Sequence, residues 1–372
     1  MHLGIDAHRL AIARTGVARY LASLLAEWAA WPPEELPFDR VTLFSPRPVE
    51  APVCYGRVVG GGRLPLALWE HVWLPWRARR LGVDLLFCPA YVIPLGYRGA
   101  GGRAVVTIHD VMQEAIPGEF PFSSRFRHAP LYRSSARRAA TILTVSEASR
   151  RDIERYYGVP PGRIAVVPLA ADPSFHPRPD DDPGDLRARY RLGQAPVILF
   201  VGKFSRRRNL PALIAAFARL VHDGCPHVLV LVGVNHLGLR VDELARRAGV
   251  GDRVIYARFV PDDDLRLLYA LADLFVYPSE MEGFGLPVLE AMASGTPVVT
   301  LRRPVFEEVA GDAACYAESG TPEALHAAMA GVVADRARHA ELRRKGLERA
   351  RAFSWATTAR RTMDVLRMTS DE

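Results

Sequence analysis

The sequence predicts a two-domain α/β protein in which each domain is built on a mostly parallel sheet. Short apolar runs alternate with segments of helical periodicity, and this alternation occurs in two separate series. A segment rich in proline and aspartate lies between the two series. The length of 372 residues also suits two cores of ordinary size better than one.

The first series covers residues 1–172. It opens with a short strand within residues 1–10, and residues 17–30 then repeat apolar side chains at helical spacing. Further strand-like runs lie at 41–45, 84–88, 104–108, 141–145 and 164–168. Because helical patterns separate these runs, we expect a parallel sheet that helices cover on both faces.

The second series follows a break in the pattern. Residues 172–185 contain four prolines and five aspartates, so residues 173–190 are predicted to be a linker. The second domain is predicted to span residues 191–355. Its strand-like runs lie at 197–202, 227–233, 253–260, 273–278 and 296–301, and the last sixty or so residues are helical in pattern.

Positive charge is concentrated in the first half of the chain. Residues 1–172 contain 21 Arg and Lys against 15 Asp and Glu, whereas residues 173–372 contain 27 against 26. Such a surplus suits an anionic membrane surface, a phosphorylated acceptor or nucleic acid, and a solvated basic face explains it equally well. No zinc-finger, aromatic RNA-binding or helix-turn-helix pattern is present, so no nucleic acid is expected as a partner.

The sequence predicts a cytoplasmic protein. The amino terminus lacks the charged and apolar regions of a signal peptide, and no apolar run approaches the roughly 20 residues that a bilayer requires. The four cysteines are far apart and have no metal-ligand spacing. Peripheral association with the inner membrane face, through the basic first domain, is left open.

Chemistry-bearing residues are densest in the segment 277–297. An expected strand ends at Tyr277, a loop carries Glu282 and two glycines, and Pro287 stands where a helix would begin. Glycines let a ligand approach the backbone, and a helix N-terminus attracts a pyrophosphate. Seven residues separate Glu282 from Glu290, which places one carboxylate in the loop and the other about one turn inside the helix. Both can accept hydrogen bonds from ribose or sugar hydroxyls.

A second segment, residues 201–217, supplies positive charge. The expected strand ends at Gly202, Lys203 follows, and three consecutive arginines precede Asn209, a candidate helix N-cap. An arginine run by itself is more often a solvated face. Beside the first segment, we predict that Arg207 and Arg208 stabilise the charge on a leaving diphosphate.

These motifs resemble the signature of the retaining glycosyltransferases of family 4. The resemblance rests on Glu282, Gly-Phe-Gly-Leu-Pro, Glu290 and the run LEAMASGTPVV at 289–299, and it extends over most of the chain. It implies the GT-B fold, in which two Rossmann-like domains face each other across a cleft, and a final helix (356–372) that packs back on the first domain. Family members usually have Arg-Lys-Asn where this chain has Arg207-Arg208-Asn209.

The resemblance assigns roles to individual residues. It implies that Glu290 binds the donor ribose, that Glu282 contacts the transferred sugar, and that His109 reaches this sugar from the acceptor side. We therefore predict His109, Glu282 and Arg208 as catalytic residues, although a histidine in such a position is more often structural and Asp110 can be a helix cap. The predicted donor-binding residues are Gly16, Lys203, Arg207, Arg208, Gly283, Phe284, Gly285, Leu286 and Glu290.

No metal and no cofactor are predicted, and the nucleotide sugar is a substrate. Two aspartate runs, 180–182 and 262–264, fit the Asp-x-Asp pattern that binds divalent cations. We interpret the first as linker and the second as a helix start. Trp69, Trp73 and Trp76 are interpreted as a packing stripe, with a membrane role left open by the arginines beside them.

The sequence thus predicts a retaining, metal-independent hexosyltransferase. The segments 69–71 and 109–110 are similar to those of bacterial mannosyltransferases of surface polysaccharide assembly, so GDP-mannose is the first donor expected, with a saccharide or lipid-linked acceptor. A nucleotide-sugar epimerase of the same fold and a non-catalytic sugar-nucleotide-binding subunit are the alternatives. A phosphorylase-like enzyme is disfavoured because Lys203 and Lys345 are the only lysines.

Overall fold

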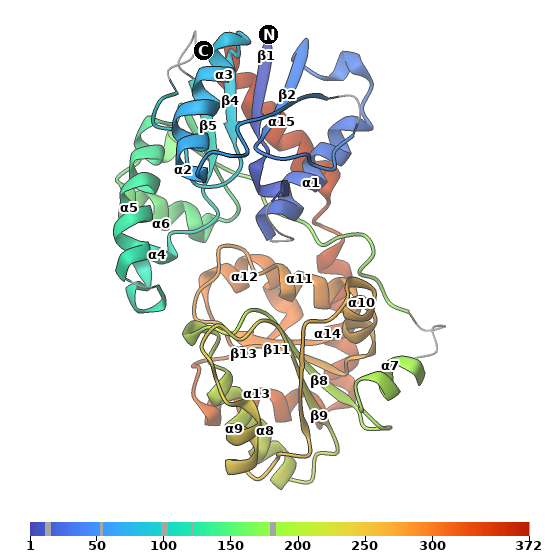
Figure 1. The fold of residues 1–372 in the computed structure, drawn as a ribbon. Helices are drawn as coiled ribbons and strands as arrows, with labels where there is room; N and C mark the ends of the chain where they lie inside the picture. Colours follow the sequence, from blue (N-terminus) through green and yellow to red (C-terminus); the bar gives the residue numbers. More distant parts are fainter. Residues whose placement is uncertain (12–15, 53–54, 98–102, 121, 179–183, 372) are drawn as a thin grey trace. The chain divides into compact units, whose positions relative to one another are not determined.

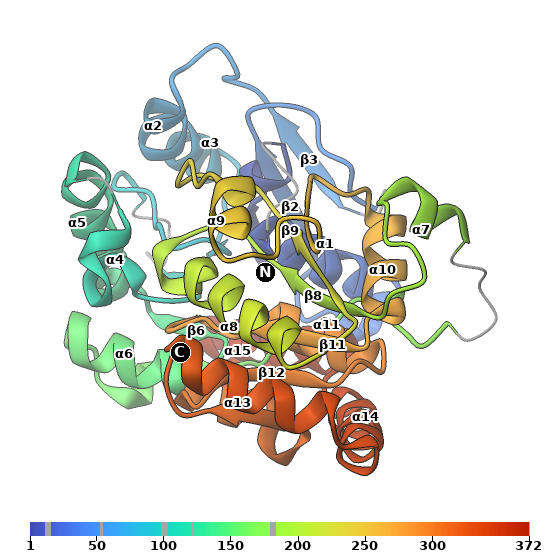
Figure 2. The same cartoon turned by 90° about the horizontal axis from the view of Figure 1, so that it is seen from below.

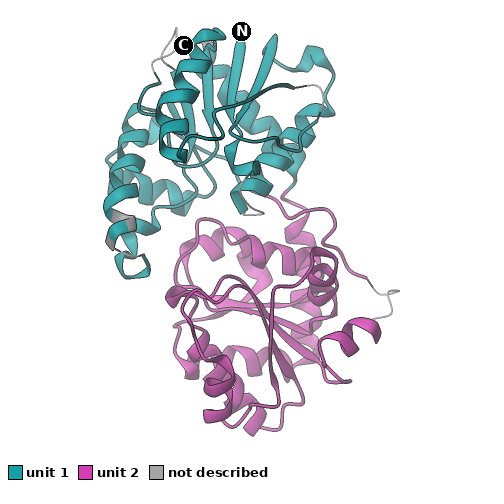
Figure 3. Ribbon diagram, viewed as in Figure 1, with its two compact units in different colours: residues 1–169, 354–372 teal, residues 170–353 magenta. Residues whose placement is uncertain are grey.

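The computed structural model of the chain divides into two compact units (Figure 3). It describes residues 1–11, 16–52, 55–97, 103–120, 122–178 and 184–371. Unit 1 comprises residues 1–169 and 354–372, and unit 2 comprises residues 170–353. The boundary between the two units after residue 169 lies three residues before residue 172, where the sequence analysis ended the first domain.

Unit 1 is built on a seven-stranded sheet with the order β3-β2-β1-β4-β5-β6-β7, in which every pair of neighbouring strands is parallel. Its strands are β1 (His2–Asp6), β2 (Arg40–Ser45), β3 (Gly56–Val59), β4 (Leu85–Cys88), β5 (Arg103–Thr107), β6 (Thr141–Thr144) and β7 (Ile164–Val166). The central strands are apolar and buried, as expected of a sheet covered on both faces.

Helices connect the strands of unit 1 (Figure 1). They are α1 (Gly16–Ala29), α2 (Leu66–Leu68), α3 (Leu74–Arg80), α4 (Met112–Ala115), α5 (Phe122–Arg138), α6 (Glu147–Tyr157) and, from the end of the chain, α15 (Trp355–Asp371). Helix α15 packs on α1, where the Trp28 indole donates a hydrogen bond to the carbonyl of Ala359 across 3.0 Å. The final helix therefore completes the first unit.

Unit 2 repeats the same architecture with six parallel strands in the order β10-β9-β8-β11-β12-β13. The strands are β8 (Val197–Val201), β9 (Val228–Val232), β10 (Val254–Arg258), β11 (Leu274–Tyr277), β12 (Val298–Leu301) and β13 (Ala314–Ala317). The helices are α7 (Gly184–Arg189), α8 (Leu210–His222), α9 (Val241–Arg247), α10 (Asp262–Leu271), α11 (Leu286–Ala293), α12 (Pro304–Ala310), α13 (Pro322–Val333) and α14 (Arg336–Ala350).

Part of the segment that the sequence assigned to the linker is helical. Helix α7 is held to α10 because Arg189 pairs with Asp264 at 2.6 Å and the Tyr190 hydroxyl donates to the same carboxylate at 2.8 Å. Asp263 pairs with Arg266 within α10 at 2.6 Å. Asp263 and Asp264 of α10 thus make ion pairs with arginines, and the run 180–182 lies outside the described residues.

The expected tryptophan stripe packs only in part. Trp69 is fully buried and stacks on Trp73 with 5.8 Å between ring centroids. Trp76, by contrast, is 47% exposed, and the guanidinium of Arg80 lies 4.5 Å from the centre of its ring. The prediction of a packing stripe is therefore wrong for Trp76, because the helix that carries it turns this position toward solvent.

Within the described parts of the chain, no helix is both long and apolar enough to cross a membrane. Three of the four cysteines lie among the described residues, and all three are buried and unpaired by disulfides: Cys88, Cys225 and Cys315.

Candidate active site

The predicted site of unit 2 lies where β8 and β11 end. These two strands are neighbours in the parallel sheet, so the loops that follow them share one edge. The loop after β8 carries residues 202–209, and the loop after β11 carries residues 278–285. Ligands of open α/β sheets bind at the carboxyl ends of the strands, which makes this edge the expected place for a nucleotide.

Glu282 is at the centre of the cluster and has only 10% of its side chain exposed. Its Oε1 atom accepts a hydrogen bond from the Tyr277 hydroxyl at 2.6 Å and from Ser279 Oγ at 3.0 Å. Arg208 Nε donates to the same oxygen at 3.0 Å, and Arg207 pairs with it as well. Side chains from both loops therefore converge on one carboxylate oxygen.

The two arginines keep Glu282 ionised. Burial alone would raise the pKa of this carboxyl group, but the charges of Arg208 and Arg207 outweigh burial and lower the pKa to about 2. Each guanidinium is also held by other groups. Arg207 Nη1 donates to Ser279 Oγ at 3.0 Å, and Arg208 lies 5.5 Å from the Tyr277 ring centre while its Nη1 donates to the carbonyl of Lys203 at 2.9 Å. The site thus holds two fixed cations in nearly buried positions.

Helix α11 begins at this edge and carries the second glutamate of the motif. Gly285 precedes the helix with φ of 96°, and a Cβ there would lie 2.9 Å from the ring of Phe306, so the position requires glycine. Glu290 is 6% exposed and accepts a hydrogen bond from the Tyr269 hydroxyl at 3.0 Å. Gly283 and Phe284 are buried in the same loop.

One expected feature of the basic loop, a helix cap by Asn209, differs from the prediction, and the role of Lys203 toward a donor stays a prediction. Lys203 is exposed, and the cluster around Glu282 includes only its backbone carbonyl. Asn209 occupies the N-cap position of α8 with φ of 46°, but its side chain does not cap the helix. The Asn209 amide donates instead to the carbonyl of Gly320 at 2.8 Å. A cap requires an acceptor aimed at the first turn, and the left-handed backbone turns this side chain toward a neighbouring loop.

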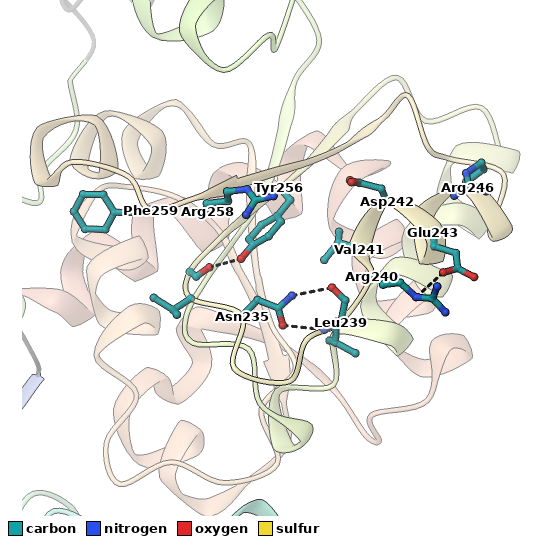
Figure 4. A pocket seen from close by; sticks show the side chains of 12 residues that line it. Asn235, Leu239, Arg240, Val241, Asp242, Glu243, Arg246, Tyr256, Arg258 and Phe259 are labelled. Atoms are coloured by element: carbon teal, nitrogen blue, oxygen red, sulfur yellow. Dashed lines mark hydrogen bonds and ion pairs between the residues drawn. The ribbon is translucent and has the colours of Figure 1, made fainter.

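A pocket of 780 Å³ lies farther along the same sheet edge, after β9 and β10 (Figure 4). Asn235 closes one side of it by accepting from the Leu239 amide at 3.0 Å and donating to the Leu239 carbonyl at 2.8 Å. The Tyr256 hydroxyl donates to the carbonyl of Gly233 at 3.1 Å, and Arg258 lies over the Tyr256 ring. The sequence analysis missed this pocket, because its residues come from the loop after β9, from α9 and from the end of β10, which share no motif.

In unit 1, His109 follows β5 and is buried at the carboxyl edge of the sheet. Its Nε2 atom bonds to the carbonyl of Pro89 at 3.0 Å, and the rings of Tyr20 and Tyr91 lie edge-on at 5.1 and 5.6 Å between centroids. Burial lowers the pKa of His109, so the imidazole is neutral at pH 7. Because a carbonyl can only accept, Nε2 carries the proton and Nδ1 is the acceptor.

The other candidate residues of unit 1 are Asp110 and Gly16, whose contact with a ligand stays a prediction. Asp110 Oδ1 accepts from the amide of Met112, the first residue of α4, and Oδ2 accepts from the Tyr91 hydroxyl at 2.8 Å. Asp110 is therefore not the N-cap of α4, which is Val111, but its carboxylate bonds to the first turn from one residue earlier. Gly16 is the first residue of α1 and is exposed, and a Cβ there would meet no neighbour within 4 Å. Arg14 and Thr15 of the same loop lie outside the described residues.

A polar cluster that the sequence analysis missed lies at the end of β1. Asp6, His8 and Glu70 place one ligand atom each within 4.8 Å of one another, and they form the only such group of three His, Cys, Asp or Glu side chains among the described residues. His8 Nδ1 bonds to Asp6 Oδ1 at 2.7 Å. Burial and the charge of Asp6 raise the pKa of Glu70 to about 7. The signal that would have revealed it is Asp6 at the end of the first strand.

Comparisons with known proteins agree with this geometry. Residues 185–352 match the family described as "Glycosyl transferases group 1", and residues 14–175 match the family described as "Glycosyltransferase Family 4". The O-antigen chain mannosyltransferase B of Escherichia coli is 33% identical over 271 residues, which cover 72% of this chain and 70% of that protein. The serotype-specific mannosyltransferase WbdA of Escherichia coli is 28% identical over 74% of this chain, a segment that spans only 34% of WbdA.

The fold also matches solved structures. HepE of Anabaena, crystallised with UDP-glucose, superimposes with a TM-score of 0.74 at 18% identity, and the match covers 98% of each chain. Two parallel-sheet domains with this similarity define a glycosyltransferase of the GT-B fold. The chain belongs to glycosyltransferase family 4. The predictions of the family and the fold class are thereby confirmed.

Proposed function

We propose that this glycosyltransferase transfers a hexose from a nucleotide diphosphate sugar to a saccharide or lipid-linked saccharide, with retention of anomeric configuration and without a metal. The observation that carries the proposal is the arginine pair fixed on Glu282. A nucleotide diphosphate gains negative charge as its bond to the sugar breaks. Arg207 and Arg208 supply positive charge at the sheet edge where a nucleotide is expected, and Glu282 holds both in place.

In the proposed binding mode, different residues of this sheet edge bind different parts of the donor. All the hydrogen bonds between Glu282 and described residues end on Oε1, so Oε2 is proposed to accept from a hydroxyl of the transferred sugar. Glu290 is proposed to bind the ribose. The start of α11 and the loop that contains Gly283 and Gly285 are proposed to hold the phosphates. The pocket at Tyr256 and Arg258 is proposed to receive the base, since it lies on the same edge.

The proposed reaction is a front-face displacement through an oxocarbenium-like state. The bond from the anomeric carbon to the phosphate oxygen breaks, and the acceptor oxygen forms its bond on the same face. The leaving phosphate takes the proton of the acceptor hydroxyl. The residues then act by positioning and by stabilising charge. In this proposal His109, neutral at pH 7, hydrogen-bonds a hydroxyl of the transferred sugar.

The acceptor is proposed to bind at the carboxyl edge of unit 1. The cluster of Asp6, His8 and Glu70 offers acceptors and, through protonated Glu70, a donor, which suits the hydroxyl groups of an uncharged sugar. An anionic group would meet the Asp6 carboxylate there. We therefore propose a neutral saccharide end as the acceptor. The Escherichia coli mannosyltransferases support mannose as the sugar, and GDP-mannose is the first donor to test.

A thermal-shift titration tests the proposal. The protein and its Glu290→Ala variant are melted with GDP, UDP, ADP and the corresponding sugar nucleotides, because a ligand that binds only the folded state raises Tm by mass action. We expect GDP and GDP-mannose to raise the Tm of the wild type by several degrees and to have little effect on the variant. Glu307→Ala, an exposed glutamate on α12, is the matched control and should respond like the wild type.

Product analysis completes the test. Transfer to a mannose-terminated acceptor with an α-linked product from GDP-α-mannose supports retention, and a β-linked product contradicts it. Conversion of the donor sugar without any acceptor would support an epimerase instead. If no nucleotide raises Tm, the donor proposal fails.

A further inference from the structure

Arg303 connects the start of α12 to the loop that follows β11. It is the residue before α12, and it follows the end of β12 by two positions. Its Nε atom donates a hydrogen bond to Oε2 of Glu280 at 3.0 Å, and its Nη2 atom pairs with the same oxygen. Nη1 donates to the carbonyl of Arg302 at 2.8 Å, so the guanidinium is also fixed on its own loop. The loop 278–285, which carries Glu282, is thereby held to the loop after β12.

The backbone of Glu280 is also bonded to the basic loop. Its amide donates to the carbonyl of Arg207 at 2.9 Å. Two residues farther along the chain, the Glu282 carboxylate accepts from Arg208 at 3.0 Å and pairs with Arg207. Glu280 therefore links Arg303 to the cluster around Glu282. Because the two backbones are bonded, a shift of Glu280 changes the place of Arg207.

Close packing at Gly320 restricts the Glu280 side chain further. Gly320 lies in the loop after β13, and a Cβ there would lie 2.7 Å from Glu280 Oε1 and 3.0 Å from Nδ2 of Asn209. The Asn209 amide donates to the carbonyl of Gly320 at 2.8 Å. Strands β8, β11 and β12 follow one another in the sheet of unit 2 (Figure 2), and β13 is next to β12. The loops after all four strands thus meet around the Glu280 carboxylate.

We propose that Arg303 is a positioning residue for sugar transfer. The pair of Arg303 and Glu280 forms a clamp that holds the loop 278–285 against the loop 202–209, and the clamp fixes the place of Glu282 and its two arginines. The proposal deepens the proposed function and rests on it, because that function needs charge at a defined point of the site. A group that stabilises a transition state must be held to within about 0.5 Å, and the groups around it supply that constraint.

The exposure of the clamp separates this role from a contribution to global stability. The side chains of Arg303 and Glu280 are 30% and 40% exposed. Ion pairs with this exposure add little to the free energy of unfolding, because water competes with each partner. Both residues lie in loops rather than in strands, so loss of the pair should loosen the loops while the sheet remains intact.

Arg302 provides a matched control. It is adjacent to Arg303 and 46% exposed, and it also makes ion pairs. Its partners are Glu318 after β13, at 2.8 Å, and Glu307 on α12, at 3.1 Å. Arg302→Gln therefore removes the same charge from the same loop while the pair of Arg303 and Glu280 stays intact.

Steady-state transfer kinetics with GDP-mannose and a mannose-terminated acceptor test the clamp. We expect Arg303→Gln and Glu280→Gln each to lower kcat by about 10- to 100-fold, with a much smaller change in the donor KM, because the placed charges act on the transition state. The double variant should lose no more than either single variant, since both remove one interaction. The reversed pair Arg303→Glu/Glu280→Arg should recover part of the loss. Arg302→Gln should stay within about twofold of the wild type.

Amide hydrogen exchange tests the clamp without any activity. In the free protein, Arg303→Gln should speed exchange in the loop 278–285, including the Glu280 amide, because the loop opens more often. Its Tm should change by less than about 3 °C. Arg302→Gln should leave exchange in this loop unchanged.

Unchanged loop exchange in Arg303→Gln would overturn the clamp, and a lower kcat in that case would mean that Arg303 contacts the donor itself. A much larger loss of kcat in Arg303→Gln than in Glu280→Gln would overturn it as well. If loop exchange follows the prediction while the wild-type protein transfers no sugar, only the proposed function fails. If the wild type transfers sugar and both clamp variants match it, only the clamp fails.

Discussion

The two units place sites of opposite electrostatic character on the same kind of parallel sheet edge. In unit 2, Arg207 and Arg208 surround Glu282, and their charge keeps this buried carboxyl group ionised. In unit 1, burial and the charge of Asp6 outweigh the charges of His8 and Arg9 at Glu70, so that its pKa rises to about 7. One scaffold therefore holds an acid whose pKa is lowered by arginines in one unit and an acid whose pKa is raised in the other.

The difference teaches that the side chains after each strand, rather than the fold, set the ligand chemistry. A site with two fixed guanidinium groups suits a diphosphate, whose charge it can stabilise. A site with a carboxylate, an imidazole and a neutral carboxyl group suits hydroxyl groups. This comparison supports the proposed assignment of the donor to unit 2 and of the acceptor to unit 1.

The largest effect is expected when one of the two arginines that contact Glu282 in unit 2 is replaced. Arg208→Ala should lower kcat by about 10²–10³-fold, because a fixed donor at the developing charge is lost. Arg208→Lys keeps the positive charge at this position, so it should retain much more activity. Steady-state transfer kinetics measure both variants.

Arg206→Ala is the matched control for this experiment, since Arg206 is exposed and adjacent in the same loop. It should stay within a few-fold of the wild type. Equal losses in Arg206→Ala and Arg208→Ala would mean that general positive charge, rather than a placed guanidinium, matters at this edge.

The raised pKa of Glu70 in unit 1 predicts that the free energy of unfolding depends on pH. The folded-state pKa of Glu70 is about 7 and its ordinary value is 4.5, so between these values the folded state binds the extra proton. The free energy of unfolding should therefore fall as pH rises from 4.5 through 7, by roughly 3 kcal/mol at most. Glu70→Gln resembles the protonated carboxyl group and should remove this dependence.

Urea denaturation of the wild type and Glu70→Gln at pH 5 and pH 8 measures the effect. The two proteins should be similar in stability at pH 5, and the variant should be the more stable at pH 8. A variant that is less stable at both pH values would show that Glu70 is ionised in the folded protein, and the contrast between the two units would be lost.

A smaller effect on stability is expected from a substitution at Gly285, which precedes α11. Gly285→Ala places a Cβ 2.9 Å from the Phe306 ring at a left-handed φ of 96°, which should cost about 1–3 kcal/mol of stability. The nucleotide-induced rise in Tm should shrink with it, because the loop presents its amides from this conformation. Gly331→Ala in α13 is the control: no atom lies within 4 Å of the added methyl group, so it should not destabilise the protein. Equal stabilities of the two variants would contradict the strain argument.

A further test concerns a buried histidine of unit 2 that lies outside the strand-loop-helix motif. Despite burial, hydrogen bonds to Asp273 and Cys225 raise the pKa of His227 to about 9 from an ordinary 6.5. The stabilisation should be complete below pH 6.5 and lost as pH rises through 9. His227→Gln should therefore be less stable than the wild type at pH 6 and closer to it at pH 9.5, as measured by thermal melting. A constant difference across this range would mean that His227 does not titrate in the folded protein.

The sequence by itself determined the fold class, the family and the loops that carry the two glutamates and the arginines. Apolar runs that alternate with helical periodicity predicted two parallel sheets, because strands buried on both faces must be apolar throughout. Glu282 and Glu290 were found because one continuous strand-loop-helix segment contains both, and a local pattern is readable along the chain. The arginines were found for the same reason, although the pattern could not say that they converge on Glu282.

Only the tertiary structure decided which distant residues meet. Asp6 and His8 are separated from Glu70 by some sixty positions, and the pocket near Tyr256 draws on the segment after β9 and the end of β10, so neither leaves a local pattern. Burial likewise could not be read from the chain: Trp69 is inside and Trp76 is outside on one helical segment. The reason is physical. Composition and periodicity record what each segment tends to form, whereas a pKa, a pocket and the exposure of a side chain depend on which groups the packed sheets bring together.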